Sequence, residues 1–225
     1  MIKFIGTSHI SPASINEVET TVLSYSPDII CLELDYGRFL VLTNQVKRKK
    51  YSFQNTTSFL LSLIGAYIEK KLARVVGTSP GDEMKKAIDL AKKNNIKLQL
   101  IDQDINITLK KLTSISKKEK FRILKDIIKG FFISLVPKKF LTKKFIKKNS
   151  IAFNPADVPE EKIIHVILNQ VKKSYPEIYN ALIEERNKVM ANNIKQLINN
   201  NPDKKILVII GAGHVSGIKA LLKGD

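Results

Sequence analysis

This 225-residue chain has a single cysteine, no apolar run of membrane-spanning length and no visible signal peptide. Its single cysteine, Cys31, excludes an internal disulfide framework and is typical of a protein in a reducing compartment. The first residues lead directly into a glycine turn, without the apolar stretch and cleavage site of a signal peptide. The longest apolar run, Phe59 to Ile68, is far shorter than the ~20 residues that cross a bilayer. We therefore expect a cytoplasmic protein without a membrane span in these residues.

Acidic residues are also scarce, with 21 Asp and Glu against 38 Lys and Arg. The excess is concentrated between Lys110 and Lys148, which contribute +12 of the formal net charge of +17. Nucleic-acid binding would thus concern this segment and not the fold as a whole. The segment contains no recognisable nucleic-acid module and no readable set of stacking aromatics, so we do not expect nucleic acid as a partner.

The remaining composition is that of a globular protein, with 44% hydrophobic and 26% charged residues. A chain of this length favours one domain with an insertion over two independent domains. We expect a single domain over residues 1–225, with a helical, lysine-rich insertion at about residues 106–158.

Short apolar runs alternate with helical patterns along the chain. Strands are predicted at residues 2–5, 29–34, 97–102 and 205–210, and the apolar runs at 29–34 and 205–210 are those expected of strands buried in a sheet. Helices are predicted at about residues 11–24, 81–94 and 176–200, within 39–80, and from Pro159 onward. The alternation predicts an α/β fold with a mainly parallel central sheet flanked by helices.

Polar residues follow the predicted strands, where ligands bind in open α/β sheets. They are His9, Glu33, Asp102, Asp104 and His214. A carboxylate after the buried run before Glu33 is costly unless a cation or a metal pairs with it, and the alternative is an exposed strand end. Asp102 and Asp104 suit metal binding or proton transfer, or else a helix cap or a salt bridge.

Two of the three histidines share one local pattern, in Gly6 to His9 and Gly211 to His214. The glycine lets the chain turn off the strand, and the histidine presents two ring nitrogens that can bind metal or shuttle protons. With ten glycines in the chain, two such matches are not expected by chance. The alternative for each histidine is a helix cap or a bond to a buried carbonyl. His165 lacks the pattern, and no functional role is expected for it.

Three further charged residues are candidates for ordering the site. Arg38 could pair with Glu33 or Asp35, bind a substrate carboxylate, or remain solvated. Glu185 and Arg186 interrupt the apolar stripe of a long helix, where charges need partners. They either reach the strand ends or form a structural ion pair.

In order and spacing, these residues resemble the TraB/PrgY family over nearly the whole chain. The matching segments are Gly6 to His9, Leu32 to Arg38, Gly81 to Met84, Asp102 to Asp104, Glu185 with Arg186, and Gly211 to His214. The resemblance implies a superfamily that includes Tiki proteases, erythromycin esterases and ChaN-type haem-binding proteins. Its members have two GxxH motifs and an acidic residue at the site, and they resemble metallopeptidases that use manganese or cobalt.

Two positions depart from the family pattern. Gln103 stands where the family has an arginine, and Asn187 stands where it has an aspartate. Archaeal-type relatives commonly continue into C-terminal transmembrane helices, whereas this chain stops eleven residues after His214. We therefore expect it to be part of a membrane-anchored protein.

Together, residues and resemblance predict a metal-dependent hydrolase that acts on peptides. His9 and His214 would bind Mn²⁺ or Co²⁺, with Zn²⁺ as an alternative, and Glu33 would be a further ligand or the general base. Arg38 or Arg186 would orient the substrate or stabilise an oxyanion. The competing hypothesis is a non-enzymatic protein that sequesters a peptide signal or a haem-like ligand.

Large apolar residues are interleaved with the lysines between Lys110 and Lys148. They are Phe121, Ile127, Phe131, Phe132 and Leu135. This combination predicts that the segment binds an anionic membrane surface with its apolar side chains toward the lipid. The alternative is that they pack on the core, or on a second copy of the chain in a homodimer.

Overall fold

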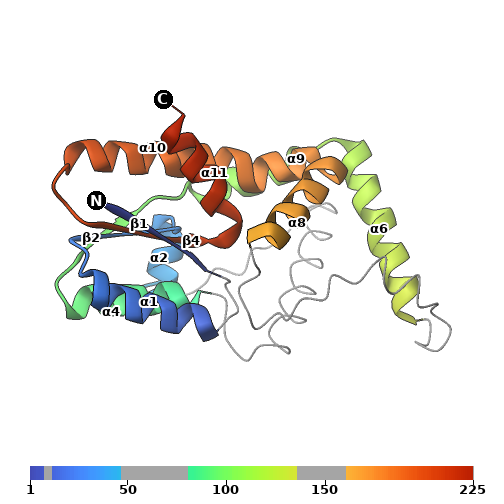
Figure 1. Ribbon diagram of the computed structural model, residues 1–225. Helices are drawn as coiled ribbons and strands as arrows, with labels where there is room; N and C mark the ends of the chain where they lie inside the picture. The colour runs from blue at the N-terminus through green and yellow to red at the C-terminus, as the bar shows by residue number, and fades with distance from the viewer. Residues whose placement is uncertain (8–11, 47–80, 136–160, 225) are drawn as a thin grey trace.

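The computed structural model describes residues 1–7, 12–46, 81–135 and 161–224 (Figure 1). Its centre is a parallel four-stranded sheet with the strand order β1-β4-β2-β3. The strands are β1 (Ile2–Thr7), β2 (Ile29–Leu32), β3 (Lys97–Leu100) and β4 (Ile206–Gly211). The predicted α/β fold is confirmed, and the four predicted strands form with ends that differ by one or two residues.

Helices cover both faces of the sheet (Figure 1). They are α1 (Pro12–Tyr25) and α4 (Asp82–Lys93) on one face, and α10 (Glu185–Asn200) and α11 (Ala212–Lys223) on the other. Because side chains alternate along a strand, Ile30 and Leu32 pack in the core under α1 and α4, whereas Ile29 and Cys31 pack under α10 and α11. The near-continuous apolar pattern of β2 and β4 follows from this two-sided burial.

The remaining helices of the described residues are mostly outside this central layer. They are α2 (Tyr36–Leu42), α5 (Ile105–Ser114), α6 (Lys117–Leu135), α8 (Glu161–Ser174), α9 (Pro176–Tyr179) and the π-helical turn η2 (Asn180–Glu184). The elements α9, η2 and α10 follow one another directly, and together they cover the residues of the helix predicted at 176–200. Figure 1 shows α6 extending away from the sheet beyond α9.

Several expectations fall on parts of the chain outside the described residues. These are the helices predicted between 47 and 80 with their apolar run, and residues 136–158 of the lysine-rich insertion. Of the apolar side chains predicted to face lipid, only that of Phe121 is described, and it is 70% exposed. Within the described ranges, no helix combines the length and the hydropathy that a membrane crossing needs.

Candidate functional site

Polar side chains from three adjacent strands meet at the carboxyl edge of the sheet. The backbone ladder continues past the ends of β2 and β3, because N–H of Glu33 donates to Ile209 O at 3.2 Å and N–H of Asp102 donates to Leu34 O at 3.3 Å. Helix α11 begins directly after β4, so His214 lies in its first turn. Glu33, Asp102 and His214 therefore lie at one edge, as the strand-end rule predicts.

Glu33 is a buried carboxylate with partners for both oxygens. Its Oε2 accepts a hydrogen bond from the backbone N–H of Gly211 at 2.5 Å. Its Oε1 accepts one from Nη2 of Arg186. Burial of a carboxylate is costly unless it is paired and hydrogen-bonded, and these contacts offset that cost.

The guanidinium of Arg186 is the hub of the cluster. Nη2 contacts Glu33, and it also donates to Oδ2 of Asp102 at 2.6 Å. Nη1 donates to Leu182 O at 3.2 Å and lies 3.3 Å from Nε2 of His214. Burial disfavours the charged guanidinium, but the hydrogen bond to Asp102 and the charges of Glu33 and Asp102 outweigh it and raise the pKa of Arg186. Arg186 reaches the strand ends through ion pairs with Glu33 and Asp102, so the contacts agree with both alternatives stated for it.

Asp102 joins the two arginines of the site. Its side chain is 1% exposed, and it accepts hydrogen bonds from both Arg186 and Arg38. Arg38 also donates from Nε to Asp35 at 2.5 Å, while Asp35 caps the N-terminus of α2 by accepting from the Arg38 backbone. Arg38 thus pairs with Asp35 and Asp102, and no bond from it to Glu33 is seen. Two guanidinium groups, those of Arg38 and Arg186, are shared by the three buried carboxylates of Glu33, Asp35 and Asp102. The cluster is therefore close to neutral, with a small excess of negative charge.

His214 is buried and held from both ring nitrogens. Its Nδ1 lies 2.6 Å from Oδ1 of Asn187 on α10. An amide oxygen can only accept a hydrogen bond, so Nδ1 carries the proton and Nε2 keeps its lone pair. That lone pair faces Nη1 of Arg186, and Nε2 is also 3.5 Å from Oε1 of Glu33. The arrangement suits an imidazole that binds a cation or accepts a proton.

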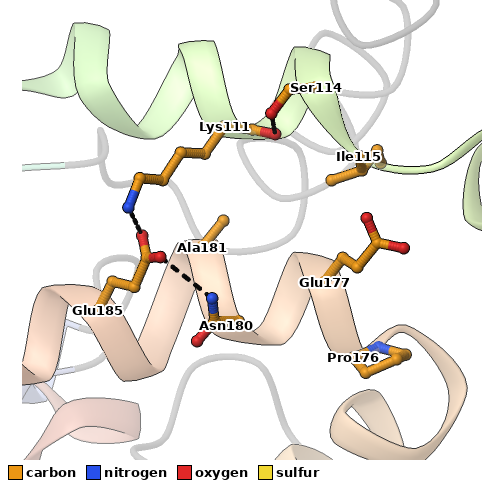
Figure 2. Close-up of a pocket in the computed structure, with 8 residues that line it drawn as sticks. All are labelled: Lys111, Ser114, Ile115, Pro176, Glu177, Asn180, Ala181 and Glu185. Atoms are coloured by element: carbon orange, nitrogen blue, oxygen red, sulfur yellow. Dashed lines mark hydrogen bonds and ion pairs between the residues drawn. The ribbon is translucent and has the colours of Figure 1, made fainter.

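The side chain of Glu185 does not join that of its sequence neighbour Arg186 at the strand ends. Glu185 turns to the other side of the helix, where Oε2 contacts Nζ of Lys111 and Oε1 accepts from Asn180 Nδ2 at 3.1 Å (Figure 2). These side chains line an open pocket between the end of α5 and the α9–η2 segment. The structure therefore brings Arg186, but not Glu185, to the strand ends.

Asp104, the remaining acidic candidate, and Gln103, which departs from the family pattern, both have hydrogen-bond partners that give them a structural role. Asp104 caps α5 by accepting from the backbone N–H of Asn106 at 2.7 Å, which is the capping alternative. Gln103 is buried and donates from Nε2 to the hydroxyl of Thr108 at 2.8 Å. Its own backbone N–H donates to Oδ1 of Asp102 at 2.8 Å. Gln103 therefore orients Asp102 through its main chain, while its side chain anchors α5.

Two residues of the site, Asn187 and Gly217, were not predicted as partners, whereas Asp35 was predicted as one possible partner of Arg38 and does pair with it. Asn187 is adjacent to Arg186 in sequence, but nothing in a single sequence indicates that it meets His214. Gly217 packs so closely on Asn187 that an added Cβ would lie 2.3 Å from its Nδ2.

His9, the other predicted histidine ligand, lies in residues 8–11, outside the described residues. Within the described ranges, no group of three or more His, Cys, Asp or Glu is arranged to hold a metal ion. Glu33 and His214 are the two candidate ligands that the described residues bring together. Their pairing, and not a complete metal centre, is what the geometry establishes.

Comparison with known proteins identifies the family of the chain. A model of the TraB/PrgY/gumN family matches residues 2–224. An uncharacterized protein of Methanocaldococcus jannaschii is 36% identical over 228 aligned residues, which cover 99% of this chain and 53% of that protein. The chain spans about half the length of that relative. On the extent of both matches, this chain belongs to the TraB/PrgY/gumN family.

Proposed function

We propose that the chain is a metal-dependent hydrolase that acts on peptides. The observation that carries the proposal is a pair of buried donor atoms at the carboxyl edge of the sheet. Nε2 of His214 lies 3.5 Å from Oε1 of Glu33. A neutral imidazole nitrogen and a carboxylate oxygen are ligands that Mn²⁺, Co²⁺ and Zn²⁺ accept.

Two features of this pair fit such an ion. Neighbouring ligands of a tetrahedral ion with bonds of about 2.1 Å lie about 3.4 Å apart, close to the separation of Nε2 and Oε1. Metal-binding histidines also commonly donate their other ring N–H to an oxygen, as His214 does to Asn187. A third ligand would come from His9, which lies outside the described residues.

The chain's own groups match the needs of peptide hydrolysis. A bound divalent ion supplies Lewis acidity, which polarises the peptide carbonyl. Water adds to the carbonyl carbon, the C–N bond breaks, and a proton passes from the water to the leaving amine. If Glu33 is the base and not a ligand, its Oε1 would take and return that proton, while its Oε2 stays bonded to Gly211. Arg38, whose side chain is 32% exposed, would bind the substrate from the solvent side.

Calorimetric titration of the metal-free protein with Co²⁺, Mn²⁺ and Zn²⁺ tests the ligand assignment. His214→Ala should weaken binding by at least about tenfold, because it removes a ligand. His165→Ala is the matched control, since His165 is an exposed histidine on α8 and should leave the affinity unchanged. Equal affinity of the wild type and His214→Ala would remove the assignment.

Glu33→Gln separates the two roles considered for the carboxylate. If Glu33 is the base, the variant binds metal but loses turnover, whereas loss of metal binding identifies it as a ligand. Affinity should also fall as the pH drops through ~6.5, because protons compete with the ion for imidazole.

The peptide substrate rests on analogy with the family and not on a contact in the site. A peptide library incubated with the metal-loaded protein tests it. Cleavage that is lost in His214→Ala supports a peptidase. Saturable peptide binding without cleavage instead supports the sequestering function.

A further inference from the structure

We propose that Arg186 is a displaceable internal cation, which holds Glu33 and His214 in the metal-free protein and gives way to the divalent ion. The inference rests on the proposed function, because it concerns the same two donor atoms. It assigns to Arg186 the role of setting the metal affinity of the site.

The guanidinium of Arg186 and the divalent ion would compete for the same lone pairs of Glu33 and His214. Nη1 of Arg186 lies 3.3 Å from Nε2 of His214, and Nη2 donates to Oε1 of Glu33. With Nδ1 protonated, Nε2 of His214 has one lone pair, which can accept a hydrogen bond or bind a metal but cannot do both. A divalent ion bound to these two donor atoms would also lie close to the guanidinium of Arg186, and the two cations would repel each other strongly in a buried site. Arg186 in its observed position therefore excludes the ion.

The guanidinium of Arg186 also keeps the site assembled in the absence of metal. The side chains of Glu33 and Asp102 are 3% and 1% exposed, and Arg186 bonds to both. Without a cation between them, these carboxylates would repel each other in a low-dielectric environment. Arg186 supplies that cation from within the chain, so the strand ends and α10 stay together before any ion binds.

Arg186 has a second set of hydrogen-bond partners that are not among the proposed metal ligands. Nε lies 3.2 Å from each carboxylate oxygen of Asp102, and Nη2 is 2.6 Å from Oδ2. Nη1 also donates to Leu182 O, a carbonyl of the π-helical turn η2. The side chain can therefore give up Glu33 and His214 while it keeps Asp102. Turns of this type occur frequently at functional sites.

Removal of the guanidinium should consequently tighten metal binding, although it removes a residue of the site. Co²⁺ is titrated into the metal-free wild type and into Arg186→Gln, Arg38→Gln and His214→Ala. Arg38→Gln is the matched control, because Arg38 also bonds to Asp102, and the side-chain bonds of Arg38 seen among the described residues go to Asp35 and Asp102. We expect Arg186→Gln to bind Co²⁺ more tightly than Arg38→Gln by on the order of tenfold or more.

A measurement on the wild type keeps the test independent of variant folding. In side-chain NMR spectra of the arginines, Zn²⁺ should shift the Nε–H resonance of Arg186. That of Arg122, which bonds to Ser174 O, should not move. If the Arg186 resonance does not move in the zinc-loaded protein, the proposed displacement of Arg186 by the ion is wrong.

The outcomes also separate this inference from the proposed function. If wild-type binding depends on His214 but Arg186→Gln binds no more tightly than Arg38→Gln, the exchange is wrong and the metal site stands. If none of the proteins binds Co²⁺, both are wrong.

Discussion

The side-chain oxygen of Asn187 accepts a hydrogen bond from Nδ1 of His214, with 2.6 Å between the two atoms. The bond fixes the tautomer of the imidazole and directs Nε2 toward Glu33 and Arg186. An aspartate at this position would add a further carboxylate to a cluster that already contains those of Glu33, Asp35 and Asp102. Asparagine orients the ring without that charge.

Asn187→Ala should therefore destabilise the protein and impair the site. The variant leaves the buried Nδ1–H of His214 without this acceptor, which costs about 1–3 kcal/mol in the free energy of unfolding. It should also weaken metal binding by roughly 10–100-fold, because the ligand loses its orientation. Asn193→Ala is the control, since Asn193 on the same helix donates to Ile101 O and is not bonded to His214. Equal metal affinities of the two variants would contradict the orienting role.

Gly217→Ala should reproduce the effect of Asn187→Ala from the opposite side of the contact. The new Cβ would lie 2.3 Å from Nδ2 of Asn187, so the amide must move away from His214. We expect a loss of about 1–3 kcal/mol in the free energy of unfolding, measured by denaturant titration. Gly213→Ala is the control on the same helix, because its Cβ would meet Leu168 at an ordinary 3.9 Å. A destabilisation by Gly213→Ala as large as that by Gly217→Ala would refute the packing argument.

Much of the sheet could be predicted because two-sided burial leaves a strong apolar signal in β2 and β4. The end of β1 could not, since Gly6 and Thr7 are strand residues through their pairing with Ile210 and Gly211 of β4. That pairing spans the length of the chain and leaves no local pattern. Strand ends are set by such partners, whereas strand centres are set by burial.

The site was predictable to the extent that it depends on strand ends. Glu33, Asp102 and His214 follow their strands directly, so topology alone brings them together. The direction of Arg186 and Glu185 depends on the rotation of α10 about its axis. Sequence reasoning assumes 3.6 residues per turn, as in an α-helix. The π-helical turn η2 breaks this spacing, because each of its hydrogen bonds encloses one more residue than in an α-helix. The sequence could therefore place a charge at the site without identifying which of the two it is.

The base of α6 is tied to the α8–α9 junction by reciprocal contacts. Glu119 is buried and accepts from the backbone N–H groups of Glu177 and Ile178, at the start of α9. Glu177 in turn accepts from the backbone N–H of Ser116, just before α6, and hydrogen bonding to the side chain and then to the backbone of Ser116 lowers the pKa of Glu177. The hydroxyl of Tyr175 donates to Asp126 at 2.6 Å. These contacts fix how α6 leaves the body of the protein.

The Tyr175 contact predicts an alkaline transition in this region. Burial and then the hydrogen bond to Asp126 raise the pKa of Tyr175 to about 12. Because this value lies above the ordinary ~10, the protonated phenol stabilises the folded state. That stabilisation is complete below pH ~10 and is lost as the pH rises toward about 12. Asp126→Asn should lower the pKa of Tyr175, and Tyr175→Phe should remove one late step from the tyrosinate absorbance titration. The contact would be excluded if Tyr175→Phe removed an ordinary step near pH ~10 instead of a late one, or if Asp126→Asn left the late step unmoved.

The exposed face of α6 is the basis of the last prediction. Phe121 is 70% exposed and lies between Lys118, Lys120 and Lys125 in a segment of strong positive charge. An aromatic side chain surrounded by lysines can be attracted to anionic lipid and then partly buried at its surface. We therefore propose that α6 and the rest of the segment from Lys110 to Lys148 bind an anionic membrane surface.

Flotation of the 225-residue chain with liposomes tests this proposal. The chain should float with vesicles that contain phosphatidylglycerol but not with pure phosphatidylcholine, because charge supplies the first attraction. Binding should weaken as added salt shortens the Debye length below the ~8 Å of physiological solution. Phe121→Ser should reduce flotation, whereas Val166→Ser should not, since Val166 is 62% exposed on α8, outside the basic segment. Equal flotation with both vesicle types, or with neither, would mean that the lysines of α6 are only a solvated surface and that Phe121 faces another partner.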